Sequence, residues 1–209
     1  METPDAALFK RWLREAMEVI PRGQGYRFEP SPLELGSDKN PRDPHYDGVS
    51  QDVWVGHERV ARSAPDGATY CCGVTFEVFA RAWALGCQEQ GASEGLGSLT
   101  GAQLHEFITT WYCPTMGHLG VVEALVGSGL GFRVDPEQAQ SGDFCQFWRS
   151  TEMPGASGHS VVFLGWEGPK KTSVRYWSSQ AATDGVGVYQ EPIGEGWTWG
   201  FARVGVLEP

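Results

Sequence analysis

Two short stretches of the sequence carry the residue types that nucleophilic catalysis by a thiol requires. Cys71 follows a turn-rich stretch and stands just before an apolar helical pattern at 73–85. The N-terminus of a helix presents unpaired N–H groups and the positive end of the helix dipole, and both stabilise a thiolate. His159 begins the apolar strand pattern at 160–164, directly after a flexible turn. That position gives a general base rigid support on one side and an open edge on the other.

Each of these residues also has a structural interpretation. Cys71 and Cys72 are small and apolar enough to be ordinary buried residues of a helix. A histidine at the start of a strand is often held by hydrogen bonds and takes no part in chemistry. The order of the two motifs along the chain, followed by a polar strand end, favours the catalytic interpretation.

The polar strand end follows the stretch Tyr176-Trp177. Ser178 and Gln180 alternate on one face of the expected strand, and Ser179 points to the other. An antiparallel neighbour of the His159 strand can deliver a polar side chain that fixes the imidazole ring and its tautomer. We expect Gln180 to fill that role because of its length and its amide, with Ser178 as the alternative.

The elements that position these residues change type near the middle of the chain. Residues 5–20 show the apolar spacing of an amphipathic helix, and Pro21 ends it. Further helices are expected at 73–85, 102–111 and 119–128, and strands at 144–148, 160–164, 174–177, 185–189 and 201–207. Helices followed by strands separated by turns predict an α+β fold, with a helical layer on an antiparallel sheet of about five strands.

Three motifs resemble the NlpC/P60 group of papain-like cysteine peptidases and amidases, to which the CHAP amidases are related. Cys71-Cys72-Gly73-Val74-Thr75 is similar to the family's Cys-Ser-Gly-Phe-Thr helix start. The stretch GDFCQFW at 142–148 is similar to its Gly-Asp-Leu-Val-Phe-Phe strand, and GHSVVFLG at 158–165 to its Gly-His-Val-Gly-Ile-Tyr-Leu-Gly strand. The resemblance covers residues 53–190 and implies a papain-like thiol hydrolase acting on amide bonds, often in peptidoglycan.

The resemblance also implies a role for each site residue. The nucleophile stands two residues before the glycine of the motif, which selects Cys71. His159 corresponds to the base, and the third position, often a histidine in the family, falls on Gln180 or Ser178. The oxyanion hole combines the Cys71 backbone N–H with an upstream donor, for which Tyr46, Gln51 and Tyr70 are the candidates. The aromatic residues expected to contact substrate are Tyr70, Trp148 and Trp177.

The chain departs from the family pattern in two places. The spacing between Cys71 and His159 is longer than a compact member needs, which predicts an insertion at about 87–118. The Tyr-Val-Trp-Gly-Gly signature that normally precedes the cysteine is reduced to VWVG at 53–56. We therefore expect a hydrolase domain at 53–209, and an N-terminal helix with an irregular arm at 1–52 packed on it.

Composition excludes several other functions. The 26 acidic residues outnumber the 16 Lys and Arg, giving a net charge of −10, and nucleic-acid binding needs a basic surface instead. No apolar run approaches the roughly 20 residues of a membrane-spanning helix. The five cysteines contain no CxxC pair, and CPTMGH at 113–118 is at most half a metal site. We expect no metal and no cofactor.

The substrate and the compartment stay open at this point. The resemblance favours the peptide part of bacterial peptidoglycan, with an inhibitor or immunity protein as a further partner if the enzyme is a delivered toxin. The same Cys-His site also suits an acyltransferase or a deamidase, and a papain-like module without catalysis would bind peptide or glycan. The N-terminus lacks the features of a secretory signal, so we expect a cytoplasmic protein, export without a signal, or a secreted protein whose signal has been removed.

Overall fold

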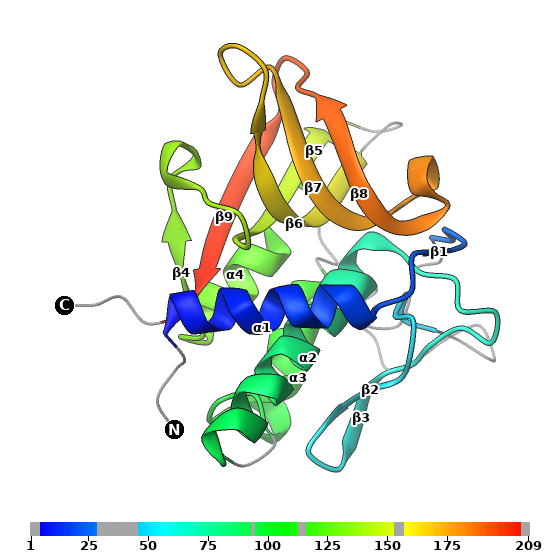
Figure 1. The fold of residues 1–209 in the computed structure, drawn as a ribbon, viewed down its shortest axis with the longest axis vertical. Helices are drawn as coiled ribbons and strands as arrows, with labels where there is room; N and C mark the ends of the chain where they lie inside the picture. Colours follow the sequence, from blue (N-terminus) through cyan, green and yellow to red (C-terminus); the bar gives the residue numbers. More distant parts are fainter. Residues whose placement is uncertain (1–4, 29–45, 93–94, 113–115, 153–156, 206–209) are drawn as a thin grey trace.

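The C-terminal half of the chain and one short N-terminal strand form a large antiparallel sheet (Figure 1). The computed structural model describes residues 5–28, 46–92, 95–112, 116–152 and 157–205. Seven strands pair in the order β1-β8-β7-β6-β5-β9-β4. They are β1 (Gly23–Gln24), β4 (Gly131–Val134), β5 (Phe144–Ser150), β6 (Ser157–Glu167), β7 (Ser173–Gln180), β8 (Gly185–Pro192) and β9 (Thr198–Val204).

The prediction of an α+β fold is confirmed, and the expected number of about five strands is wrong. The five expected strands correspond to β5, β6, β7, β8 and β9, and the two edge strands β1 and β4 are additional. Both are short, and their pairing is set at long range: Gly23 pairs with Val186, and Val134 pairs with Phe201. A segment of two to four residues carries too little alternation to be recognised as a strand.

Both faces of the sheet are apolar, because the sheet packs on helices on one side and curls over itself on the other. Phe144, Val162 and Trp177 belong to the core that the sheet shares with the helices. Their strand neighbours Phe147 and Tyr176 belong to a second apolar cluster, whose rings come from strands that are not adjacent. Phe147 on β5 and Tyr176 on β7 lie 5.8 Å apart between ring centroids, across the intervening strand β6. We call this second face the concave face.

The described residues form four α-helices, which gather on one side of the sheet (Figure 1). They are α1 (Ala6–Val19), α2 (Cys71–Gln90), α3 (Gly101–Trp111) and α4 (Gly120–Gly127), and two short 3₁₀ turns lie at Pro136–Gln138 and Ala181–Thr183. Each α-helix falls where the apolar periodicity predicts one. Thr100 stands at the N-cap of α3 as expected, although its side chain makes no capping hydrogen bond.

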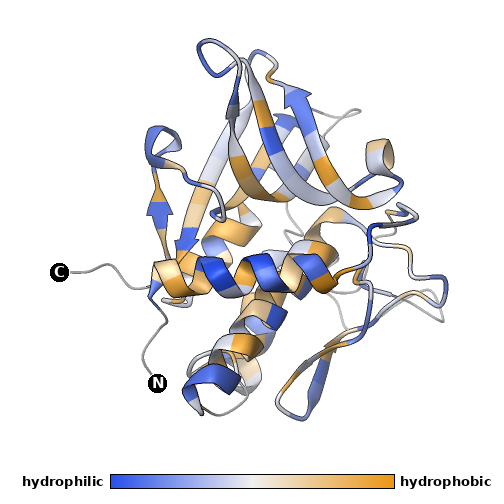
Figure 2. Cartoon of the chain, viewed as in Figure 1, coloured by the Kyte–Doolittle hydropathy of each residue, from blue (hydrophilic) through white to orange (hydrophobic). Residues whose placement is uncertain are grey.

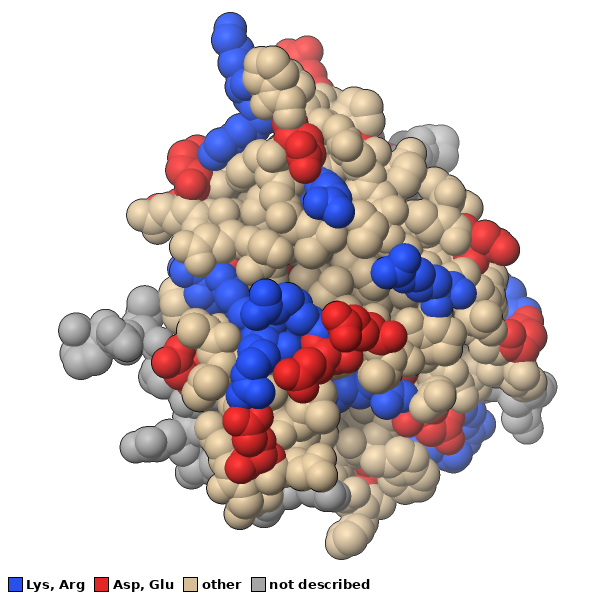
Figure 3. Space-filling model, viewed as in Figure 1, with Lys and Arg blue, Asp and Glu red and all other residues tan. Residues whose placement is uncertain are grey.

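Helix α1 packs directly against α2. Phe9 and Trp12 are buried, and the Phe9 ring lies 5.9 Å from that of Phe79 between centroids. Trp12 covers Gly86, where a Cβ atom would lie only 2.5 Å from the indole ring. Figure 2 shows the alternation of polar and apolar residues along α1, which leaves a hydrophilic outer face. Figure 3 shows acidic and basic side chains side by side over this helix, where Arg11 pairs with Glu89 at 2.7 Å.

The segment that precedes α2 lies across the start of that helix. It includes a hairpin of β2 (Val53–Val55) and β3 (Glu58–Ala61). Much of the predicted irregular arm, 29–45, lies outside the described residues. Helix α3 falls inside the predicted insertion, and its Phe107 ring lies 5.6 Å from that of Phe79. The division into an arm, a hydrolase domain and an insertion stays a prediction. In the part of the chain that the structure describes, no helix has the length and apolar character needed to cross a membrane.

Candidate active site

Cys71 is the first residue of α2. Tyr70 is the N-cap and has an extended backbone, with φ −143° and ψ 171°. The N–H groups of the first helical turn have no partner within the helix, and the positive end of its dipole lies there. The Cys71 residue is 7% exposed. The thiol therefore lies at the N-terminus of a helix, where the sequence predicts it, and it is buried there.

Two hydroxyl groups connect the first turn of α2 to strand β6. The Thr75 hydroxyl donates to the carbonyl oxygens of Cys71 and Cys72, at 2.9 and 3.1 Å. It also lies 2.8 Å from the hydroxyl of Ser160, the residue next to His159. All of these groups are buried. The helix that carries the thiol is therefore fixed in register against the strand that carries the imidazole.

His159 is the third residue of β6 and is 4% exposed. It pairs with Phe147 on β5, and its ring stands edge-on to two aromatic rings of the concave face. The centroid distances are 5.5 Å to Phe147 and 5.3 Å to Tyr176. These contacts restrict the imidazole from two sides.

The Cys71 thiol lies close enough to the imidazole of His159 for His159 to affect the pKa of the thiol. The pKa of the Cys71 thiol lies well below its usual range, and the largest cause is a hydrogen bond from Cys72, whose Sγ lies 3.8 Å from Sγ of Cys71. The hydrogen bond and the positive charge of His159 lower it further, as does the backbone of Ser160, and burial acts in the opposite direction. A thiolate beside an imidazolium is the reactive form of a nucleophilic cysteine.

Neither Ser178 nor Gln180 is seen to bond His159. The Ser178 hydroxyl donates to the carbonyl oxygen of Ser160 at 2.7 Å, and the Gln180 amide donates to the hydroxyl of Thr183. However, Oε1 of Gln180 and Nε2 of His159 are both buried without a hydrogen-bond partner.

The register of strands β6 and β7 indicates which residue lies opposite His159. Paired hydrogen bonds between β6 and β7 end at Val162 and Trp177, although both strands continue. Extending that register by three residues places His159 opposite Gln180. The assignment of Gln180 as the orienting residue, with Ser178 as the alternative, stays a prediction.

The three aromatic residues expected to contact substrate are buried in this structure. Tyr70, Trp148 and Trp177 are 0, 7 and 3% exposed. The Tyr70 ring lies against Phe28 and Tyr112, and Trp148 donates its indole N–H to the carbonyl oxygen of His118 at 2.7 Å. As placed, these rings support the site from within the core. Contact between any of them and a substrate stays a prediction.

The other candidates for the oxyanion donor lie upstream of α2. The Gln51 side chain accepts a hydrogen bond from Arg81 at 2.9 Å, three turns along the helix from Cys71. The Tyr46 ring lies beneath the guanidinium of Arg27, 4.3 Å from it. The backbone N–H of Cys71, which belongs to the first turn of the helix, remains the donor that the fold itself supplies.

Two residues of the cysteine motif have structural roles. A Cβ atom on Gly73 would lie 2.2 Å from the carbonyl oxygen of Asp47, so only glycine lets the upstream segment cross the start of the helix this closely. Glu77 is fully buried one turn later. It accepts hydrogen bonds from the backbone and hydroxyl of Ser50, at 2.6 and 2.8 Å, and from Arg81 at 2.9 Å. Together these contacts hold the segment before Cys71 onto α2.

Asp143, the acid of the GDF motif, is a structural anchor. Its buried carboxylate forms a two-pronged ion pair with Arg203 of β9, with both distances 2.8 Å. It accepts the backbone N–H of Gln140 at 2.7 Å, and Lys10 of α1 lies 3.6 Å away. The expected turn is present, and the carboxylate also joins that turn to a strand and to the N-terminal helix.

A partly buried ion pair near His159 was not predicted from the sequence. Arg149 of β5 binds Glu191 of β8 through two hydrogen bonds of 2.7 Å, and Tyr176 donates its hydroxyl to Glu191 at 2.8 Å. The signal in the sequence was a charged residue at an inward position of each strand, two residues after Phe147 and two after Tyr189. Strand alternation alone does not reveal that the two charges meet.

Other clusters and grooves lie away from Cys71. No group of three potential metal-binding side chains occurs among the described residues, and Cys113 of the CPTMGH stretch falls outside them.

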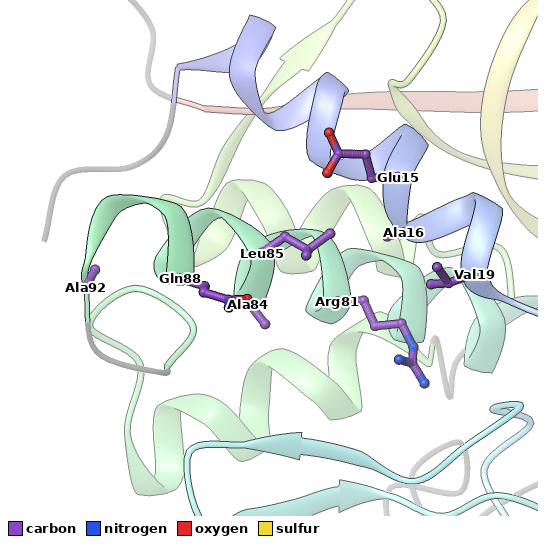
Figure 4. A pocket seen from close by; sticks show the side chains of 8 residues that line it. All are labelled: Glu15, Ala16, Val19, Arg81, Ala84, Leu85, Gln88 and Ala92. Carbon is purple, nitrogen blue, oxygen red and sulfur yellow. The ribbon is translucent and has the colours of Figure 1, made fainter.

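A groove of about 600 Å³ runs between α1 and the C-terminal half of α2, at the opposite end of the helix from Cys71 (Figure 4). Its lining residues are Glu15, Ala16, Val19, Arg81, Ala84, Leu85, Gln88 and Ala92.

Comparison of the chain with models of protein families, with curated proteins and with solved structures found no match. The functional argument therefore depends on the geometry of Cys71 and His159 and on the motifs that carry them.

Proposed function

We propose that this protein is a papain-like cysteine hydrolase that cleaves an amide bond, with Cys71 as the nucleophile and His159 as the acid and base. The observation that carries the proposal is the interaction of the two side chains at the N-terminus of α2. The order of elements supports it: a cysteine at the start of a buried helix, a histidine near the start of an antiparallel strand, and a polar end on the next strand.

The reaction begins with attack of the Cys71 thiolate on the amide carbonyl carbon. Negative charge develops on the carbonyl oxygen, where the N–H groups of the first turn of α2 stabilise it. The His159 imidazolium gives its proton to the leaving amine as the C–N bond breaks. A thioester of Cys71 and a neutral imidazole remain.

Water completes the cycle. Neutral His159 takes a proton from a water molecule, and the resulting hydroxide attacks the thioester carbonyl. The C–S bond breaks, the carboxylic acid product leaves, and Cys71 is again a thiolate beside a protonated imidazole. Each residue thus returns to its starting state after one turnover.

A lowered thiol pKa distinguishes this proposal from a binding module. Binding a peptide or a glycan does not require a thiolate, and burial alone raises the pKa of a cysteine. Cys145 shows this effect: it is buried on β5, and burial raises the pKa of its thiol well above the usual range. The pKa of Cys71 is lowered instead of raised, because specific groups around its thiol outweigh the effect of burial.

For the substrate we propose an amide in the peptide part of bacterial peptidoglycan, which the NlpC/P60 resemblance supports. The test is digestion of purified sacculi with the protein and with C71A, with the soluble products identified by liquid chromatography and mass spectrometry. We expect muropeptide fragments from the wild-type protein only. Intact sacculi, together with turnover of small peptide or acyl-amide substrates, would contradict the substrate assignment and leave the hydrolase assignment in place.

A further inference from the structure

We propose that the Arg149–Glu191 ion pair, linked to the site through Tyr176, holds Cys71 and His159 in their thiolate and imidazolium forms. This inference rests on the proposed function, and it makes Arg149, Glu191 and Tyr176 positioning residues. None of them touches the reacting atoms. They act through the charge and the packing that they place beside the Cys71–His159 pair.

The ion pair is well defined and partly buried. Nε and Nη2 of Arg149 donate to the two carboxylate oxygens of Glu191, both at 2.7 Å, and Nη1 donates to Oγ of Ser157 at 3.2 Å. The side chains of Arg149 and Glu191 are 27 and 17% exposed. The guanidinium also lies 4.9 Å from the centroid of the Phe147 ring. Two-pronged geometry of this kind fixes both side chains.

The curl of the sheet makes this contact. Strands β5 and β8 are separated by β6 and β7, so a flat sheet would hold their backbones about 14 Å apart. Their side chains meet because both point into the concave face. His159 projects between them from β6, against the rings of Phe147 and Tyr176.

Tyr176 joins the ion pair to the imidazole. Its ring lies 5.3 Å from that of His159, and its hydroxyl donates to Oε2 of Glu191 at 2.8 Å. Burial raises the pKa of Tyr176, and its bond to Glu191 raises it further, so the phenol stays a hydrogen-bond donor. The Tyr189 ring packs on Tyr176 from β8, with centroids 6.0 Å apart.

The titratable and charged groups around His159 come from four elements. They are Cys71 on α2, Arg149 on β5, Tyr176 on β7 and Glu191, with Tyr189, on β8. Burial works against ionisation of Glu191, but hydrogen bonds from Arg149 and Tyr176 and the charge of Arg149 outweigh it, and His159 adds to them. The pKa of Glu191 therefore lies below its usual range. Arg149 in turn interacts with the charge of Cys71.

The two charges are arranged to act in opposite directions. The cation of Arg149 stabilises the thiolate, and the anion of Glu191 stabilises the imidazolium. Removing the cation should raise the pH at which the Cys71 thiolate forms. Removing the anion leaves Arg149 without its partner, so this pH should fall.

The experiment is the pH dependence of Cys71 alkylation by iodoacetamide, followed by mass spectrometry, in R149M, E191Q and the double variant. The alkylation rate rises with pH as the Cys71 thiolate forms, and in R149M we expect this rise to move to higher pH. If its midpoint rises by about one pH unit, the rate at a pH below the midpoint should fall about tenfold. In E191Q the rise in alkylation rate should move to lower pH. The double variant should have a profile close to that of the wild-type protein.

Two controls make the result decisive. R149K keeps the cation and should keep a near wild-type midpoint, and labelling of buried Cys145 reports any unfolding. If R149M does not fold, the lower midpoint expected for E191Q and the near wild-type midpoint expected for R149K still test the proposal. Unchanged midpoints, or movement in the same direction for R149M and E191Q, would overturn it. Because alkylation needs no substrate, this outcome is separate from any failure to hydrolyse an amide.

Discussion

Replacing His159 with alanine should slow amide hydrolysis by about 10²–10⁴-fold, the range expected when a general acid and base is removed. In the proposed mechanism the imidazole protonates the leaving amine, and it is the base whose presence lowers the pKa of the Cys71 thiol. Its loss also withdraws a hydrogen bond and a positive charge from Cys71, so the thiolate becomes less abundant at neutral pH. Initial rates on a small acyl-amide substrate measure the effect.

The matched control is H105A. His105 is an exposed residue of α3, and its replacement should leave the rate unchanged. Circular dichroism and thermal unfolding establish that both variants are folded. A folded H159A protein that retains near wild-type turnover would show that His159 is structural.

Replacing Asp143 with alanine should cost about 3–5 kcal/mol of the free energy of unfolding, as is usual when one partner of a buried ion pair is removed. The variant leaves Arg203 without its two-pronged partner and the N–H of Gln140 without its acceptor. Whole domains of this kind are stable by only about 5–15 kcal/mol. D143A should therefore unfold at a midpoint roughly 10 °C lower than the wild-type protein.

Asp135 provides the control for this experiment. It is exposed and makes no side-chain capping bond to the turn that follows it. D135A should change stability by no more than about 0.5 kcal/mol. Thermal and urea unfolding compare the two variants, and equal stabilities would contradict the anchoring role of Asp143.

Local patterns were sufficient to predict the helices, and long-range contacts decided their ends. Helix α2 was expected to end at Leu85, before Gly86, but it continues to Gln90 and stops at Gly91, which has a left-handed backbone. Gly86 does not break the helix because the indole of Trp12 packs where a side chain would stand. Periodicity within one segment contains no information on this contact with another helix.

The positions of Cys71 at the start of a helix and of His159 near the start of a strand could be predicted because their signals are local. A cysteine at a helix start and a histidine at a strand start are each visible within about ten residues of sequence. The ion pair of Arg149 and Glu191 could not be predicted, because these residues lie on strands that are not neighbours in the sheet. Their contact depends on the curl of the sheet, which no short pattern specifies.

Selective alkylation of Cys71 tests the central claim most directly. Brief treatment with iodoacetamide at pH about 6 should label Cys71 before any other cysteine, because its lowered pKa leaves a thiolate where an ordinary thiol is protonated. Cys145 should stay unlabelled, since burial raises its pKa. Limited labelling followed by peptide mass spectrometry identifies the site. Dominant labelling at Cys72 would place the nucleophile one residue later, and labelling at Cys87 or Cys113 ahead of Cys71 would contradict the proposed site.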